Sequence, residues 1–181
     1  MLNRIILTLF GIIAIIGAIA FYFYSKNEPP FVITLDGSSP IIKELHDINI
    51  TNDAKVTFDV RPSNNRGGMI LNVPSGGNIA NFKSHGVAVF LEPNSNTPTL
   101  IQTVSKDNIN KISSTKDIVT DGKYHTINVY LKDTIMYFEI DGEQIGTLAT
   151  LGGWGPANLI FGENGFGGTI KNLYVNNTII S

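Results

Sequence analysis

The stretch Asp121-Gly122-Lys123-Tyr124-His125-Thr126, with the residues that follow it, decides the fold of this 181-residue chain. Alternating apolar residues continue from it to Asp141-Gly142. An Asp-Gly pair between such residues is the strongest short-range hairpin signal, because a type I′ turn needs positive φ at both central positions. The unit ends with Phe166-Gly167-Gly168-Thr169-Ile170. This third of the chain therefore predicts antiparallel strands joined by tight turns.

The same two-residue period extends back towards Phe31. Ala54, Val56, Phe58 and Val60 alternate with polar residues, as a strand with one buried face requires. Clusters of Pro, Ser, Asn and Gly separate the apolar segments. Further strands are expected at residues 69–73, 87–91, 99–104, 124–131, 134–140, 159–162 and 170–175. So many short strands predict an all-β, antiparallel sandwich.

The composition narrows the classes of function. The net charge is -2, and the Lys and Arg residues form no dense cluster, so a nucleic-acid partner is not expected. The sequence contains no cysteine, which rules out disulfides and thiolate metal ligands. We therefore expect a single sandwich domain whose stability comes from its hydrophobic core.

An apolar run begins at Ile5 and ends at Tyr24. At ~1.5 Å rise per residue, a helix of this length covers roughly 30 Å, the thickness of the hydrocarbon core of a bilayer. A cleaved signal peptide is the alternative, because Ala18-Ile19-Ala20 has the small-x-small form that signal peptidase prefers. The expected organisation is a membrane anchor over residues 1–24, a linker over 25–30 and a sandwich over 31–181.

Retention of this segment predicts a single-pass membrane protein with an extracytoplasmic sandwich, in the periplasm or on the cell surface. Ala14, Gly17 and Ala18 place small side chains on one face of the predicted helix, where a second transmembrane helix would have room to approach. Small residues are also common in membrane helices without such a partner. Both interpretations stay open.

Three segments resemble laminin G-like domains of the concanavalin A-like lectin/glucanase superfamily. Asp121-Gly122-Lys123-Tyr124-His125 resembles the family's Asp-Gly-Lys-Trp-His, with Tyr124 in the tryptophan position. The segment from Tyr137 to Glu143 resembles its strand and Asp-Gly turn, and residues 160–170 resemble its closing glycine and aromatic signature. The resemblance covers roughly residues 121–175 and implies a jelly-roll β-sandwich. Cysteines near the end of many animal members are absent here.

Glu139-Ile140-Asp141-Gly142-Glu143 also resembles the Glu-x-Asp-x-Glu core of laminarinase- and lichenase-type glycoside hydrolases of this superfamily. A retaining hydrolase needs two carboxyl groups about 5–5.5 Å apart that face one cleft. A turn at Asp141-Gly142 would move Glu143 onto the returning strand. We therefore expect no catalytic residues, and hydrolase activity is kept as a minor alternative.

No metal or cofactor is expected from the residue pattern. His125 alternates with Ile127 and Val129, which predicts a buried, hydrogen-bonded structural histidine. Many relatives hold calcium at the rim of the sandwich, and the loops offer oxygen donors, namely Asn65, Asn78, Asn94, Asn96 and Asp107. These loops are short of the carboxylates that calcium needs, and asparagine is favoured in turns because it tolerates left-handed backbone geometry.

The candidate ligand-binding residues leave the predicted core. Asn128 and Tyr130 alternate outward on one strand, Tyr137 and Glu139 do so on its hairpin partner, and Trp154 lies between two glycines. Aromatic rings contact the apolar faces of sugars, while amide and carboxylate groups bind sugar hydroxyls. In the alternative interpretation the tyrosines only stabilise the hairpin, and Trp154 plugs one end of the sandwich.

These observations predict a binding module whose ligand is carbohydrate or a protein partner. The alternative is a structural subunit of a membrane-associated assembly, held by its membrane helix and by contacts of the sandwich or its strand edges.

Overall fold

The computed structural model describes residues 31–43, 54–73, 86–105, 108–149 and 158–180. The predicted anchor from Ile5 to Tyr24 and the candidate residue Trp154 lie outside these ranges. Among the residues that are described, no helix is long and apolar enough to cross a membrane. Residues Phe31–Ile180 form one compact unit with a continuous hydrophobic core, which is the physical requirement for independent folding.

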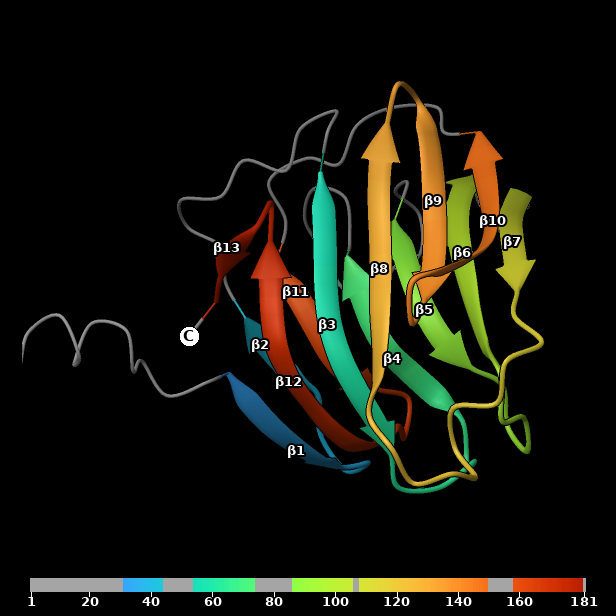
Figure 1. Cartoon of the computed structure of the whole chain (residues 1–181). Coiled ribbons are helices and arrows are strands. Elements are labelled where there is room, and N and C mark those ends of the chain that lie inside the picture. Colours follow the sequence, from blue (N-terminus) through green and yellow to red (C-terminus); the bar gives the residue numbers. More distant parts are fainter. Residues whose placement is uncertain (1–30, 44–53, 74–85, 106–107, 150–157, 181) are drawn as a thin grey trace, which may run out of the picture. The chain divides into compact units, whose positions relative to one another are not determined.

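Every element of the described part is a β-strand (Figure 1). In chain order the strands are β1 (Val32–Asp36), β2 (Ile41–Lys43), β3 (Lys55–Pro62), β4 (Gly68–Val73), β5 (Val87–Leu91), β6 (Pro98–Ser105), β7 (Asn108–Ser113), β8 (His125–Lys132), β9 (Ile135–Ile140), β10 (Glu143–Ala149), β11 (Leu159–Glu163), β12 (Gly167–Val175) and β13 (Thr178–Ile179).

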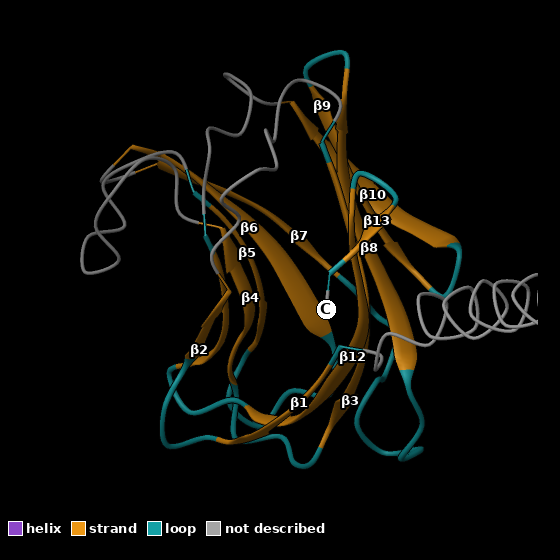
Figure 2. Ribbon diagram, turned by 90° about the vertical axis from the view of Figure 1, so that its left-hand side faces the viewer, coloured by secondary structure: helices purple, strands orange, loops and turns teal. Residues whose placement is uncertain are grey.

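The strands pair into two antiparallel sheets, which Figure 2 shows face to face. Sheet A has the order β1-β12-β3-β8-β9-β10, and β13 also pairs with β12. Sheet B has the order β2-β11-β4-β5-β6-β7. At one side of the sandwich the last strands of the two sheets, β10 and β7, contact each other, with Gly146 against Ile112. This arrangement confirms the predicted antiparallel, all-β sandwich.

The core lies between the sheets and follows from side-chain alternation. In β3, Val56, Phe58 and Val60 are fully buried, whereas the residues between them are partly exposed or exposed. Phe58 of sheet A meets Phe161 of sheet B edge to face, with ring centroids 6.0 Å apart and an interplanar angle of 77°. Such contacts between the sheets determine which residues of each strand face inward. The polar residues that alternate with them therefore lie on the outer faces.

The hairpin turn predicted at Asp141-Gly142 is confirmed, with φ of 53° and 78° at these two residues. The turn joins β9 to β10, so the chain reverses where the sequence predicts. The strand expected over residues 134–140 begins one residue too early, because Thr134 has a φ of 68° and belongs to the turn with Asp133. A two-residue type I′ turn requires both residues in the left-handed region.

The strand predictions missed β1, β2, β7 and β13. In β1 only Leu35 is buried, so the segment lacks the apolar alternation that identifies a half-buried strand. The side chains of β2 are exposed or half-exposed, and β13 has two residues. Such edge segments are strands because a neighbouring strand offers hydrogen bonds, which a local pattern does not reveal.

Candidate functional site

Four of the five candidate binding residues come together on the outer face of sheet A. Asn128 pairs with Glu139 and Tyr130 pairs with Tyr137 across β8 and β9, and all four side chains are partly exposed. They share this face because they alternate with buried residues of both strands. The fifth candidate, Trp154, lies outside the described residues.

The two tyrosines form a stacked pair. Their ring centroids are 4.7 Å apart, and the ring planes differ by 3°. The Tyr130 hydroxyl donates a hydrogen bond of 2.8 Å to Oε1 of Glu139. This bond, with a smaller contribution from burial, raises the pKa of Tyr130 to about 12. The hydrogen bond therefore fixes the orientation of the Tyr130 ring, and Tyr130 stays neutral across the physiological pH range.

Unused hydrogen-bonding groups border the stacked pair. Oδ1 of Asn128 accepts a bond of 2.7 Å from the Thr57 hydroxyl, which fixes the amide and leaves its two N–H groups directed elsewhere. Within the described part of the chain, neither these N–H groups nor the Tyr137 hydroxyl has a hydrogen-bond partner. The surface thus combines aromatic rings with free donors, and Glu139 adds acceptor oxygens.

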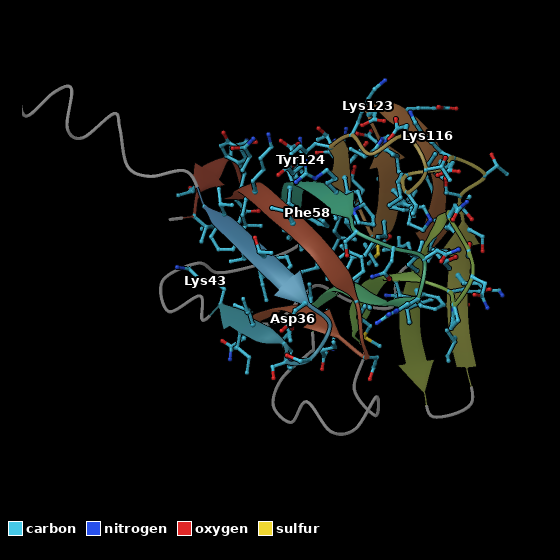
Figure 3. All side chains as sticks on the ribbon, turned by 90° about the horizontal axis from the view of Figure 1, so that it is seen from below. Asp36, Lys43, Phe58, Lys116, Lys123 and Tyr124 are labelled. Carbon is cyan, nitrogen blue, oxygen red and sulfur yellow. The ribbon has the colours of Figure 1, made fainter. Side chains whose placement is uncertain are left out.

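The sequence prediction missed a second cluster on the same face. Two cations lie over the Tyr124 ring, with Lys171 Nζ 3.9 Å and the Arg61 guanidinium 4.8 Å from its centroid. Figure 3 labels Tyr124 together with Phe58 of the core. The three residues come from β3, β12 and the segment before β8. No local signal could reveal this cluster, because only the strand order brings the residues together.

On the same face, Asp59 of β3 links the two neighbouring strands β8 and β12. Its Oδ1 accepts a bond of 2.7 Å from the Thr126 hydroxyl on β8, and its Oδ2 accepts one of 2.7 Å from Asn172 Nδ2 on β12. Both carboxylate oxygens are therefore engaged, and the polar groups along the middle of the face hold one another in place. A preorganised surface of this kind loses little side-chain entropy when a ligand binds.

His125 anchors the start of β8 beneath this face. Its Nδ1 lies 2.9 Å from Oδ2 of Asp141 and its Nε2 lies 3.1 Å from Oδ1 of Asp121. Ionised carboxylates only accept hydrogen bonds, so the protonated imidazole, in which both ring nitrogens donate, satisfies both partners. Burial lowers the pKa of His125, but the bonds to Asp141 and Asp121 outweigh burial and raise this pKa above its ordinary value. The predicted buried, hydrogen-bonded histidine is confirmed.

The carboxylates of the hydrolase-like motif do not lie along one strand. Glu139 is on β9, Asp141 is in the turn and Glu143 is on β10. Asp141 is also engaged, because its Oδ1 accepts from the Thr126 N–H at 2.8 Å and its Oδ2 lies 3.0 Å from Lys116 Nζ. The Asp141 carboxylate thus helps to hold the hairpin together. The three acidic residues differ in this from a Glu-x-Asp-x-Glu motif that runs along one continuous strand.

The structure describes only some of the loop residues that could donate oxygen to calcium. Asn78 and Asp107 lie outside the described residues. Asn94 has a φ of 62°, as expected for a turn-forming asparagine, and Asn96 Nδ2 donates to Asp117 at 3.2 Å. Among the residues that the structure covers, no three His, Asp or Glu side chains are grouped as a metal site would require.

Comparison with solved structures gives matches to the same fold. The LG1-3 region of the laminin alpha2 chain gives a TM-score of 0.65 at 13% identity, over 83% of this chain and 32% of that chain. Domains LG4-5 of the mouse laminin alpha1 chain give a TM-score of 0.63 at 14% identity, over 83% of this chain and 43% of that chain. The chain thus spans less than half of either laminin fragment.

A bacterial module gives a third match. The CBM40 of Ruminococcus gnavus IT-sialidase has a TM-score of 0.59 at 13% identity, over 84% of this chain and 91% of that chain. The same module in a structure with alpha2,3 sialyllactose bound has a TM-score of 0.54 at 14% identity, over 78% of this chain and 94% of that chain. At these identities the matches establish the fold, and they confirm the predicted laminin G-like sandwich. No family model and no curated protein matches the sequence.

Proposed function

We propose that the chain is a membrane-anchored, extracytoplasmic binding module that recognises carbohydrate through the outer face of sheet A. The observation that carries this proposal is the stacked pair of Tyr130 and Tyr137, partly exposed and bordered by Asn128 and Glu139.

The chemistry of this face suits a sugar. A sugar ring presents apolar C–H groups, which pack against aromatic carbons, and a dense set of hydroxyls, which both donate and accept hydrogen bonds. The free N–H groups of Asn128 and the hydroxyl of Tyr137 provide donors, and Glu139 provides an acceptor. Because bonds within the face already fix these groups, the ordering that binding requires is small.

The comparisons support the class of function at the level of fold. The sialidase CBM40 with alpha2,3 sialyllactose bound demonstrates that a sandwich of this architecture can carry a sugar site. A shared fold does not transfer a site, so the sugar site is proposed from Tyr130, Tyr137 and their neighbours in this chain.

Membrane attachment through the segment from Ile5 to Tyr24 completes the proposal. Sequencing the N-terminus of the mature protein tests it, because cleavage after Ala20 would leave a chain that begins at Phe21. An intact N-terminus together with extraction only by detergent is the expected result.

A glycan array with the fragment of residues 31–181 tests the binding function. Tyr137→Ala should abolish or strongly reduce the signal. Tyr174→Ala is the matched control, since Tyr174 is another partly exposed tyrosine of sheet A, 37% exposed, but lies on β12. If the wild-type fragment and Tyr137→Ala bind glycans equally, the surface around Tyr137 is not the binding site. If no glycan binds, the proposed carbohydrate-binding function is wrong.

A structural subunit of a membrane-associated assembly is the second candidate function. It is favoured by the edge strands β1 and β2, where Val32 and Ile42 are 53% and 47% exposed. Edge strands offer unpaired backbone groups to a further strand. Detergent-resistant co-purification with a larger assembly, combined with no glycan binding, would favour this alternative.

We further propose that the module is not an enzyme, with a laminarinase-like hydrolase as a minor alternative. The positions of Glu139 and Glu143 on different strands support this. A reducing-sugar assay on β-glucans provides the test: hydrolysis that Glu139→Gln abolishes would establish the alternative.

A further inference from the structure

A second candidate site lies on the opposite sheet. A hollow of about 420 Å³ is bordered by residues of β4, β5, β6 and β7 and of the adjoining loops, namely Arg66, Gly68, Met69, Phe90, Leu91, Pro93, Ile101, Ile109 and Asn164. Phe90 and Ile101 follow the core residues Val89 and Leu100, so their side chains lie on the outer face of sheet B. The hollow is therefore separate from the carbohydrate site proposed on sheet A.

Apolar side chains form most of this hollow. Ile109 is 54% exposed, and Phe90 and Ile101 are partly exposed, although aliphatic and aromatic side chains gain free energy from burial. Small-molecule sites are usually concave, mostly apolar and roughly 300–1,000 Å³ in volume, with a few polar groups that fix the ligand. The hollow matches this description in both size and lining.

The polar groups at the hollow favour an anion. Arg66 is exposed, and no carboxylate of the described residues lies within ion-pair distance of its guanidinium. Lys111 is opposite Ile101 in the register of β6 and β7 and is also exposed. The hollow has no acidic lining residue. Two acids lie next to the lining: Glu92, which is exposed and stands between Leu91 and Pro93, and Glu163, which is opposite Met69. Oε2 of Glu163 already accepts a bond from Asn72 Nδ2 at 2.6 Å.

We propose that this hollow binds a small amphiphile with an apolar body and one carboxylate. The body packs against Phe90, Ile101 and Ile109, and the carboxylate pairs with the guanidinium of Arg66. An Arg–carboxylate pair is a charge-assisted, often bidentate interaction, so it fixes the orientation of the ligand while the apolar body supplies most of the buried area. The amide of Asn164 is available as a further donor at the same rim.

Titration of the fragment of residues 31–181 with sodium decanoate, below its micelle concentration, tests this assignment by NMR. We expect the largest shift changes at Phe90, Ile101 and Ile109. Arg66→Gln should weaken decanoate binding about tenfold, and uncharged decanol should bind the wild-type fragment about tenfold more weakly than decanoate. Arg61→Gln is the matched control, because it removes an exposed arginine from sheet A and should leave decanoate binding unchanged.

A second variant tests the apolar contact. Ile109→Ser changes an exposed residue, so the fold should survive while decanoate binding weakens. Equal binding of decanoate and decanol, equal binding by Arg66→Gln and wild type, or no binding at all would overturn the proposal. Concentration-dependent self-association that Ile109→Ser abolishes would assign the hollow to a second copy of the chain and would also overturn it.

Discussion

At the scale of single residues, His125 is the clearest example of a side chain whose role follows from its partners. It is 6% exposed, and each of its ring nitrogens faces a carboxylate. The imidazole in this position links the loop that contains Asp121, the start of β8 and the turn at Asp141. The histidine therefore supports the hairpin that presents Tyr130 and Tyr137.

The stability of the fold should depend on the protonation of His125. Its pKa is raised above the ordinary 6.5, so its contribution is complete below about pH 6.5 and is lost as the pH rises through the folded-state pKa. We expect the difference in unfolding free energy between wild type and His125→Gln to shrink from pH 6 to pH 9. Denaturant unfolding of both proteins at several pH values measures this difference. A constant difference would contradict the charged-imidazole assignment.

The stacked tyrosines should contribute to stability as well as to binding. A double-mutant cycle with Tyr130→Ala and Tyr137→Ala is expected to give a coupling free energy of about 0.5–1.5 kcal/mol, as for other aromatic pairs in contact. The control cycle pairs Tyr130 with Tyr174, which β3 separates from β8, and should give a coupling near zero. No coupling between Tyr130 and Tyr137 would mean that the rings do not stack in solution.

At the scale of elements, two glycines show how the same residue type serves different purposes. Gly142 has a φ of 78° in the β9–β10 turn, and a Cβ there would meet no atom within 4 Å. Gly68 has a φ of 110° at the start of β4, where a Cβ would run into the backbone nitrogen of Phe166 and lie 2.8 Å from its Cα. Position 142 needs glycine only for its backbone conformation. Position 68 needs glycine for its backbone conformation and also because there is no room for a Cβ.

Alanine substitutions should separate these two requirements. Gly142→Ala is expected to cost about 1–2 kcal/mol of unfolding free energy, the penalty of a side chain in the left-handed region. Gly68→Ala should cost more than about 3 kcal/mol, because backbone must move as well. Thermal or denaturant unfolding of the two variants provides the measurement. Equal destabilisation would show that the close approach of β4 to Phe166 is not rigid.

The sequence predicts the elements that carry strong local patterns. The Asp-Gly turn and the alternation in β3 and β8 follow from backbone sterics and burial, which act over a few residues. The edge strands β1 and β7 escape prediction because their formation depends on pairing with distant strands.

At the scale of the whole molecule, the two outer faces differ in chemistry. Sheet A presents stacked tyrosines and bonded polar groups, whereas sheet B presents an apolar hollow whose lining includes Arg66. Alternation predicts that Asn128, Tyr130, Tyr137 and Glu139 leave the core. The cluster at Tyr124 could not be predicted, because Arg61 and Lys171 join it only through the strand order β12-β3-β8.

The most direct test of the carbohydrate site is an NMR titration of the fragment of residues 31–181 with the glycan that gives the strongest array signal. The backbone amide shifts of Asn128, Tyr130, Tyr137 and Glu139 should change most, and sheet B should be unaffected. Shift changes concentrated on sheet B, or no glycan that binds at all, would contradict the account.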